Sequence, residues 1–187
     1  IADIGIPETI IKEIRPQTHC NGPNLWYANF PVPGLNTHKY NRGHALVVGG
    51  DQMTGAARLA ARAARRVGAG LTTIAVSPEA FSIYVKEDPG NIIDARELSE
   101  IQSDPRITAT LIGPGSGTSN KTKSLVKTAR QSSNPIVIDA DALTVFGDNP
   151  SELFRILDKN CVLTPHEGEF SCLFEFQGDK IERARRA

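Results

Sequence analysis

Short apolar runs alternate with longer polar or alanine-rich segments along most of this chain. The apolar runs are rich in β-branched residues and predict strands at residues 45–48, 71–76, 108–112, 135–139 and 161–164. The segments between and after them predict helices at residues 54–67, 79–85, 97–101, 120–131, 140–146 and 150–157, with further helices beginning near residues 165 and 179. Strands that alternate with helices in this way indicate an α/β fold with a mostly parallel sheet.

The alternation is clearest between residues 43 and 77. The first apolar run ends in Gly49 and Gly50, and an Ala/Arg-rich segment of good helix formers follows until Gly68 and Gly70 end it. Strand, loop, helix and strand predict a βαβ unit with parallel strands and a right-handed crossover. Ligands of open α/β sheets bind beyond the carboxyl ends of the strands, so the glycine-rich loop at residues 49–55 is a candidate site. This loop also leads into a helix N-terminus, where free backbone N–H groups suit an anion.

The first 37 residues have a different character. Residues 1–7 predict a strand, and residues 7–14 predict one or two helical turns. Residues 15–37 are proline-rich and irregular, so we interpret them as a linker arm. The apolar residues at 25–27 and 30 predict that the arm packs on a surface, either of its own core or of a partner. We therefore divide the chain into residues 1–37 and 38–187.

Composition excludes several classes of protein. Lys plus Arg and Asp plus Glu both number 21, so no net charge points to nucleic acid or a membrane surface as a partner. No apolar run reaches the length of a membrane span, and the first residues do not resemble a signal peptide. The 3 cysteines form no CxxC pair, which predicts reduced thiols in a cytoplasmic protein. Because there is no initiator Met, we expect the chain to begin inside a longer product.

Unusual residues follow four of the predicted strands. They occupy residues 49–57, 113–117, 139–141 and 164–169, and they include paired glycines, two aspartates and a His-x-x-Glu pair. The carboxyl ends of parallel strands meet at one edge of a sheet. The sequence therefore predicts that these four loops lie along one rim and line a common pocket.

Each loop taken alone leaves alternatives open. The 113–117 loop matches a GxGxxG fingerprint only loosely, and Ala56-Ala57 replaces the Lys-Ser/Thr of a P-loop, which argues against a Walker NTPase. Glu169 is either a carboxylate that holds Mg²⁺ through water or one that stabilises a helix N-terminus. His166 is a catalyst or a structural hydrogen-bonding group, and Asp139 is a turn former or a carboxylate that faces the ligand. No GxSxG elbow or Cys-His pair suggests a nucleophile.

Several motifs, taken in order, carry a resemblance to a known family. The motifs are His38-Lys-Tyr-x-Arg-Gly-His-Ala-Leu-Val-Val-Gly-Gly, Met53-Thr-Gly-Ala-Ala, Arg66-Val-Gly-Ala-Gly-Leu-Thr, Ile112-Gly-Pro-Gly-Ser-Gly, Val137-Ile-Asp-Ala-Asp-Ala-Leu and Leu163-Thr-Pro-His-x-Gly-Glu-Phe. With these motifs, residues 38–175 are similar to the ADP/ATP-dependent NAD(P)H-hydrate dehydratases, which are repair enzymes. The resemblance implies a ribokinase-like three-layer sandwich with a mostly parallel central sheet, truncated at the C-terminus. Residues 2–7 resemble the closing strand of the epimerase domain that precedes the dehydratase in bifunctional repair proteins.

The resemblance implies a reaction and roles for particular residues. A nucleotide, ADP or ATP, would phosphorylate the hydroxyl of the hydrated nicotinamide ring, and loss of phosphate would restore NADH or NADPH. We expect hydrated NADH or NADPH to be the substrate. The implied assignments are Ala56, Gly117, His166 and Asp139 on the substrate side, Lys39 and Gly55 on the nucleotide side, and Glu169 with Mg²⁺.

The chain also departs from the family pattern. The family's Lys-Gly strand and its Gly-x-Gly-Asp motif, which supplies the catalytic Asp, would lie beyond residue 187. We therefore expect the chain alone to be inactive or nearly so, and we expect an exposed sheet edge to favour a homo-oligomer. Two other hypotheses stay open at this point: a ribokinase-like kinase of a sugar or vitamin precursor, and a non-catalytic nucleotide-binding subunit. Thr164-Pro-His166 in place of Thr-Pro-Asn favours the dehydratase.

Overall fold

The computed structural model describes residues 4–86 and 88–187. The chain forms two compact units, Ile1–Leu35 and Asn36–Ala187. This division falls close to residue 37, where the composition of the sequence changes. The identity assigned to each segment from the sequence stays a prediction.

The first unit consists of short helices without a core. It contains α1 (Glu8–Ile14), α2 (Pro23–Trp26) and the 3-10 helix η1 (Tyr27–Asn29), and none of the three buries a residue. Residues 4–7 form no strand, so the strand predicted at residues 1–7 is wrong for its described part, and residues 1–3 lie outside the described residues. A strand forms by pairing with a neighbouring strand, and residues 4–7 take part in none of the strand pairings of the described residues.

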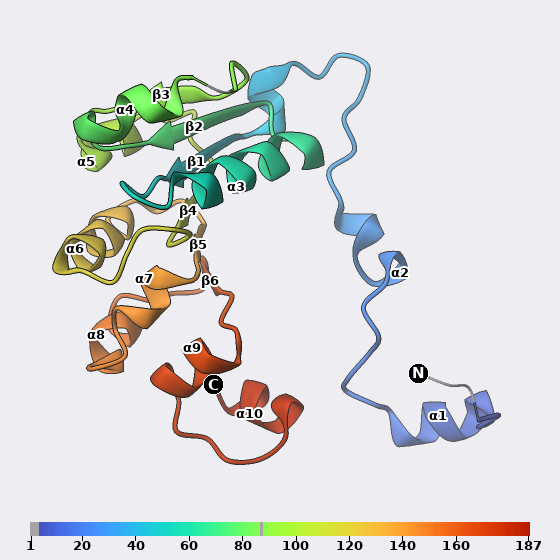
Figure 1. Ribbon diagram of the computed structural model, residues 1–187. Helices are drawn as coiled ribbons and strands as arrows, with labels where there is room; N and C mark the ends of the chain where they lie inside the picture. The colour runs from blue at the N-terminus through green and yellow to red at the C-terminus, as the bar shows by residue number, and fades with distance from the viewer. Residues whose placement is uncertain (1–3, 87) are drawn as a thin grey trace. The chain divides into compact units, whose positions relative to one another are not determined.

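A parallel sheet forms the centre of the second unit (Figure 1). Its strand order is β3-β2-β1-β4-β5-β6, and every pairing is parallel. Five of these strands match the predicted ones, and β3 was not predicted because it is a three-residue edge strand whose first residue, Ile92, is exposed. The strands are β1 (His44–Val48), β2 (Leu71–Ala75), β3 (Ile92–Asp94), β4 (Ala109–Ile112), β5 (Ile136–Ile138) and β6 (Cys161–Leu163).

Helices cover both faces of this sheet and complete a three-layer α/β sandwich. On one face α3 (Thr54–Val67) and α4 (Pro78–Tyr84) bury Ala57, Ala61 and Tyr84 against Val47 of β1. On the other face Leu46 and its neighbours pack against a larger cluster. The helices that contribute to that cluster are α5 (Leu98–Gln102), α6 (Asn120–Ala129), α7 (Asp141–Thr144), α8 (Pro150–Phe154) and α9 (Glu167–Leu173). The α/β sandwich expected from the sequence is thereby confirmed.

The path of the chain through the sheet reverses once. From β1 it moves outward through β2 to β3, and it then returns to the other side of β1 and continues through β4 and β5 to β6. The strands β1 and β4 are therefore adjacent, and the crossovers that follow them run in opposite directions. Such a switch point opens a crevice at the carboxyl ends of the two strands, which is where open α/β sheets bind ligands.

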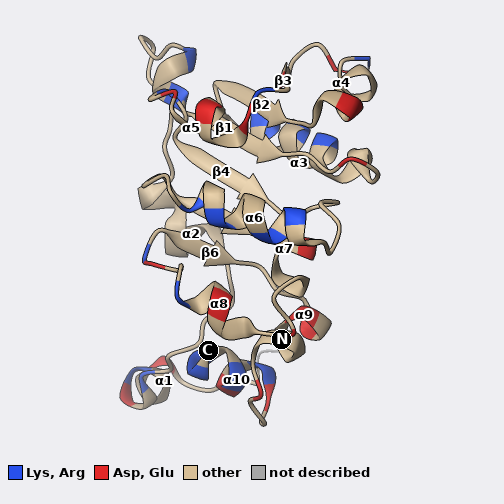
Figure 2. Ribbon diagram, turned by 90° about the vertical axis from the view of Figure 1, so that its left-hand side faces the viewer, with Lys and Arg blue, Asp and Glu red and all other residues tan. Residues whose placement is uncertain are grey.

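Two further elements complete the described part of the unit. The 3-10 helix η2 (Lys39–Arg42) precedes β1, and α10 (Lys180–Arg186) follows α9. In the described residues no helix is both long and apolar enough to cross a membrane. In Figure 2, α3 and α6 carry basic residues without acidic ones, whereas α10 carries both.

Candidate functional site

The loops after β1 and β4 touch across the switch point. A Cβ added at Gly50 would overlap the carbonyl oxygen of Gly115, and one added at Gly115 would lie 2.5 Å from the Met53 oxygen. Gly115 also has φ +73, a conformation that L side chains rarely adopt. Glycine is required at both positions because the two backbones approach closely. Tyr84 stabilises the Gly50 side of this contact, because its buried hydroxyl donates a 2.8 Å hydrogen bond to the Gly50 oxygen.

The loop after β5 joins the loop after β4. The Gly117 N–H donates a 2.8 Å hydrogen bond to Oδ2 of Asp141, at the start of α7. The Gly117 oxygen accepts a 2.6 Å hydrogen bond from the hydroxyl of Thr122 on α6. Both backbone polar groups of Gly117 are thus engaged within the chain.

The loop after β6 completes the row. The Thr164 hydroxyl donates a 2.8 Å hydrogen bond to Oδ1 of Asp139, which directly follows β5. Two residues later His166 is the N-cap of α9. Direct contacts therefore link the loops after β1, β4, β5 and β6 along the carboxyl edge of the sheet. The single rim predicted from the sequence is confirmed, and we call these four loops the rim.

His166 and Glu169 cap the first turn of α9. His166 Nδ1 accepts hydrogen bonds from the N–H groups of Gly168, at 2.9 Å, and of Glu169, at 3.2 Å. Glu169 Oε2 accepts a 2.8 Å bond from the His166 N–H, while its Oε1 lies 3.1 Å from His166 Nε2. Because Nδ1 accepts, the proton of a neutral imidazole is on Nε2. The helix-stabilising role that the sequence left open for Glu169 is therefore present.

The capping contacts of Glu169 bear on its predicted role as a ligand of Mg²⁺. Glu169 is only 6% exposed, and each of its oxygens already faces a group of His166. Within residues 4–86 and 88–187, no three His, Cys, Asp or Glu side chains gather in a group that could hold a metal ion. The described residues thus give Glu169 a capping role and do not surround it with further metal ligands.

Small residues give the rim an open surface. A Cβ added at Gly55 or at Gly117 would have no neighbour within 4 Å. Gly55 lies in the first turn of α3 and is followed by Ala56, which carries only a methyl group. The two glycines flank the contact between the first two loops, and a ligand can approach their backbone without displacing a side chain. Of the residues predicted from the sequence, Gly55, Ala56, Gly117, Asp139 and His166 all lie on the rim.

Lys39 lies elsewhere. It belongs to η2, which precedes β1, and its carbonyl oxygen packs against Gly70, directly before β2. Its ammonium lies 5.2 Å from the centre of the Tyr40 ring. Lys39 is therefore at the amino edge of the sheet, opposite to the rim, and the structure does not bring it to the other candidate residues.

One side of the rim carries an ion pair that sequence reasoning missed. Lys121 of α6 donates a 2.7 Å hydrogen bond to Asp51 in the loop after β1. This bond is the main cause that lowers the pKa of Asp51 below its usual value. The pair borders a hollow of about 190 Å³ beyond the ends of β1, β2 and β3. No spacing in the sequence relates these two residues, which are brought together by the adjacency of β1 and β4.

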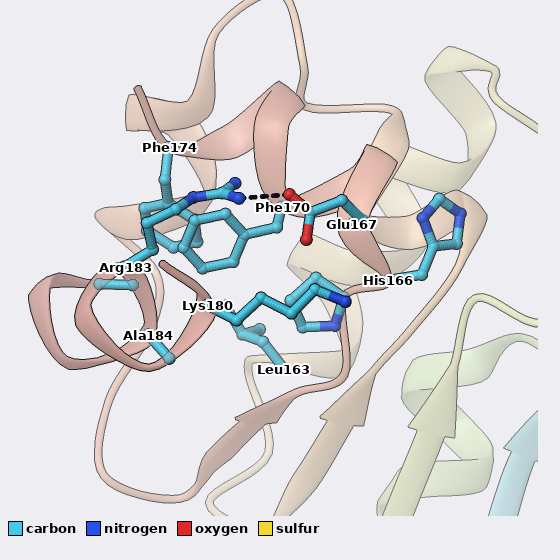
Figure 3. Close-up of a pocket in the computed structure, with 10 residues that line it drawn as sticks. Leu163, His166, Glu167, Phe170, Phe174, Lys180, Arg183 and Ala184 are labelled. Atoms are coloured by element: carbon cyan, nitrogen blue, oxygen red, sulfur yellow. Dashed lines mark hydrogen bonds and ion pairs between the residues drawn. The ribbon is translucent and has the colours of Figure 1, made fainter. Parts of the chain in front are cut away.

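A larger cleft of about 750 Å³ lies beside His166, between the end of β6 and helices α9 and α10. Phe170 and Phe174 line it, and Arg183 lies over the Phe170 ring and pairs with Glu167. In Figure 3 the His166 side chain points away from these aromatic rings. The cleft thus shares the loop after β6 and the start of α9 with the rim.

Comparison with known proteins identifies the family of this chain. The NAD(P)H-hydrate dehydratase family matches residues 45–187. The bifunctional NAD(P)H-hydrate repair enzyme of Coxiella burnetii is 34% identical over 187 residues, covering 97% of this chain and 37% of the relative. The corresponding enzyme of Dictyoglomus turgidum is 32% identical over 201 residues, covering 99% of this chain and 38% of the relative. The chain thus spans less than two fifths of the length of these relatives.

Solved structures agree on the fold. A ribokinase-like superfamily protein from Enterococcus faecalis superposes with a TM-score of 0.69 at 22% identity, covering 84% of this chain and 57% of that one. The ADP/ATP-dependent NAD(P)H-hydrate dehydratase from Bacillus subtilis, co-crystallised with ATP and Mg²⁺, has a TM-score of 0.59 at 28% identity, covering 76% and 51%. The family match, which extends from β1 to the last helix, shows that this chain belongs to the NAD(P)H-hydrate dehydratase family.

Proposed function

We propose that the rim binds the substrate in a nucleotide-dependent dehydration that returns hydrated NADH or NADPH to NADH or NADPH. The observation that carries this proposal is the convergence of the four loops at the switch point of a chain that belongs to the dehydratase family. Bound ADP or ATP supplies the phosphoryl group that turns the ring hydroxyl into a leaving group.

The small residues of the rim form the surface for the hydrated ring. Ala56 and Gly117 offer one methyl group and backbone to the ring. We also assign Gly55 to this surface, in place of the nucleotide-side role implied by the resemblance, because Gly55 directly precedes Ala56 in α3 and a side chain added there would enter open space. The hydrated nicotinamide ring can therefore pack against the rim without displacing a side chain. Asp139, held by Thr164, stands beside this surface.

His166 contacts the substrate through its ring face. Its Nδ1 already accepts two backbone N–H groups in the first turn of α9, so this nitrogen is not poised to accept a proton from the substrate. Its side chain is nevertheless 72% exposed. An exposed, oriented aromatic face is suited to stacking on a nicotinamide ring.

The nucleotide side of the reaction belongs to polypeptide outside these residues. The described residues do not gather a magnesium ligand set, and Asp51, in the Gly50-Asp51 pair, is engaged by Lys121. We propose that the catalytic base lies in the part of the relatives that this chain does not span. It follows that the 187-residue chain alone is inactive or nearly so.

Three further proposals concern context. The relatives are bifunctional, and we propose that an epimerase domain adjoins the first unit of this chain in the same polypeptide. We place the activity in the cytoplasm, since the 3 cysteines are free, as is usual in a reducing compartment. We propose that the 187-residue chain self-associates, because β6 forms an edge of the described sheet and Val162 on it is exposed.

The direct test uses the product of the whole reading frame that contains these residues. It is incubated with hydrated NADH, Mg²⁺ and either ADP or ATP, and the reduced-nicotinamide absorbance is followed. Recovery of absorbance that depends on nucleotide supports the proposal, and the 187-residue chain serves as the control with little or no recovery. No recovery with either nucleotide, together with phosphorylation of a sugar or vitamin precursor, would establish the kinase reading instead.

A further inference from the structure

We infer that Asp141 is a positioning residue that holds the Gly117 loop in the shape the substrate requires. This inference rests on the proposed function, and it concerns a residue to which neither the sequence motifs nor the relatives' names give a role. The evidence is the hydrogen bond of 2.8 Å from the Gly117 N–H to Asp141 Oδ2, which joins the loop after β4 to the start of α7.

The contacts of Gly117 define what remains for a ligand. Its N–H is taken by Asp141 and its carbonyl oxygen by Thr122. Its φ of +75 turns the position where a Cβ would be into open space. Gly117 therefore meets the substrate through its Cα surface, and not as a hydrogen-bond donor. Asp141 and Thr122, which bind the Gly117 backbone, set the position and orientation of that surface.

Asp141 is itself held in place by an unusual turn. Ala140, between Asp139 and Asp141, has φ 48 and ψ −124, a combination that a residue with a side chain rarely adopts. Asp139 on one side accepts the hydrogen bond from Thr164, and Asp141 on the other side accepts the one from Gly117. We call residues 139–141 the clasp, since they join the loop that leads to His166 to the loop that carries Gly117.

The clasp explains why two carboxylates stand so close together after β5. Asp139 accepts a hydrogen bond from the loop after β6, and Asp141 accepts one from the loop after β4. The two carboxylates therefore hold neighbouring loops of the rim together. If Asp141 only stabilised α7, its loss would lower stability without changing the Gly117 loop. If it positions that loop, its loss reduces the fraction of molecules whose rim fits the substrate, and the apparent affinity falls by that fraction.

The first test measures the hydrogen bond itself and does not depend on activity. Amide hydrogen exchange of the 187-residue chain is compared between the native sequence and the variants Asp141→Ala, Asp141→Asn and Asp148→Ala. Asp148 is an exposed aspartate in the loop after α7 and serves as the matched control. We expect Gly117 N–H exchange to be about tenfold faster in D141A, near native in D141N, whose side-chain oxygen still accepts, and unchanged in D148A. Equal exchange in D141A and the native chain would overturn the inference.

The second test uses the whole polypeptide with hydrated NADH and ADP or ATP. D141A is expected to raise KM for hydrated NADH about fivefold with kcat within about twofold, and D141N is expected to restore most of the loss. A fall in thermal stability with KM unchanged would show a purely structural role and overturn the inference. If the native polypeptide itself shows no activity, the proposed function fails, while the exchange experiment still decides whether Asp141 holds the loop.

Discussion

Gly50, in the loop after β1, and Gly55, in the first turn of the helix that follows it, meet opposite requirements. At Gly50 a side chain would collide with the backbone of the neighbouring loop, whereas at Gly55 a side chain would meet nothing within 4 Å. Gly55 also lies in a helix, where alanine is the more stable residue. The first glycine is therefore explained by the packing of this chain, and the second is explained only by something that approaches from outside.

This contrast gives a prediction for two substitutions. Gly55→Ala is expected to leave stability unchanged or raise it by up to about 1 kcal/mol, and to weaken binding of hydrated NADPH about tenfold or more. Gly50→Ala is expected to destabilise the fold by about 3 kcal/mol or more, because the Gly115 backbone has to move. Urea unfolding and titration with hydrated NADPH measure the two effects. Native-like binding by G55A would argue that no ligand approaches the rim at this position.

His166 gives a second prediction, in which its capping and its exposed ring are separated. Asn in its place carries a side-chain oxygen that can accept the same backbone N–H groups, and Ala carries none. We expect His166→Ala to lose about 1 kcal/mol of unfolding free energy and His166→Asn to lose less than about 0.5. Both variants lack the aromatic face, so both are expected to raise KM for the hydrated substrate. If H166N bound substrate as the native protein does, the ring would have no role in binding.

His44 predicts how stability depends on pH. This residue at the start of β1 is 5% exposed, and its Nε2 lies 2.7 Å from the Thr73 hydroxyl oxygen. Burial is the main cause that lowers its pKa below the usual 6.5. The unfolded chain therefore binds the proton more readily than the folded one, and the stabilisation present above the unfolded pKa is lost as the pH falls below it. The urea concentration at the unfolding midpoint should fall as the pH is lowered from about 7 to about 5.5. His44→Gln should weaken this pH dependence over the same range. A flat native curve would contradict this account.

The turn between β5 and α7 is the element that connects the most parts of the rim. Within two residues of the end of β5 it contacts the loop after β6, and at the first residue of α7 it contacts the loop after β4. The strained conformation of Ala140 is compatible with this double duty, because strained backbone persists where the surroundings determine it. The strain at Ala140 lowers the free energy of unfolding, and the same conformation places both carboxylates beside their partner loops.

That cost can be measured with two glycine substitutions. Ala140→Gly is expected to raise unfolding free energy by about 1 kcal/mol, since glycine relieves the strain at φ 48. Ala142→Gly, at a buried site in α7, is the matched control and is expected to lose about 1 kcal/mol. Urea unfolding of the two variants provides the comparison. Equal losses in both would show that the turn stores no strain.

Regular elements were predictable where the apolar pattern was long enough. The helix at Thr54–Val67 and the strands on either side of it follow from an alanine-rich segment between two β-branched runs. The three residues of β3 are too few to show a period, and one of them is exposed at the sheet edge. Residues 4–7 have strand-like composition but no strand beside them, and composition does not reveal a missing neighbour.

At the scale of the whole molecule, the sequence predicted the rim but not its internal contacts. Any residue that follows a parallel strand reaches the same edge, so four such loops could be placed together without knowing the strand order. The adjacency of β1 and β4, and with it the pairing of Asp51 with Lys121, depends on that order. The position of Lys39 was recoverable from the same rule, because a residue that precedes a strand lies at the opposite edge.

The central claim is that the rim receives the hydrated dinucleotide. Amide hydrogen exchange of the whole polypeptide, with and without hydrated NADPH and in the absence of ADP and ATP, tests it most directly. Residues 53–57, 115–118, 139–141 and 164–169 are predicted to exchange more slowly in the presence of hydrated NADPH, while residues 39–42 and 68–70 at the amino edge are predicted not to change. Protection at the amino edge with the four loops unaffected would contradict the account.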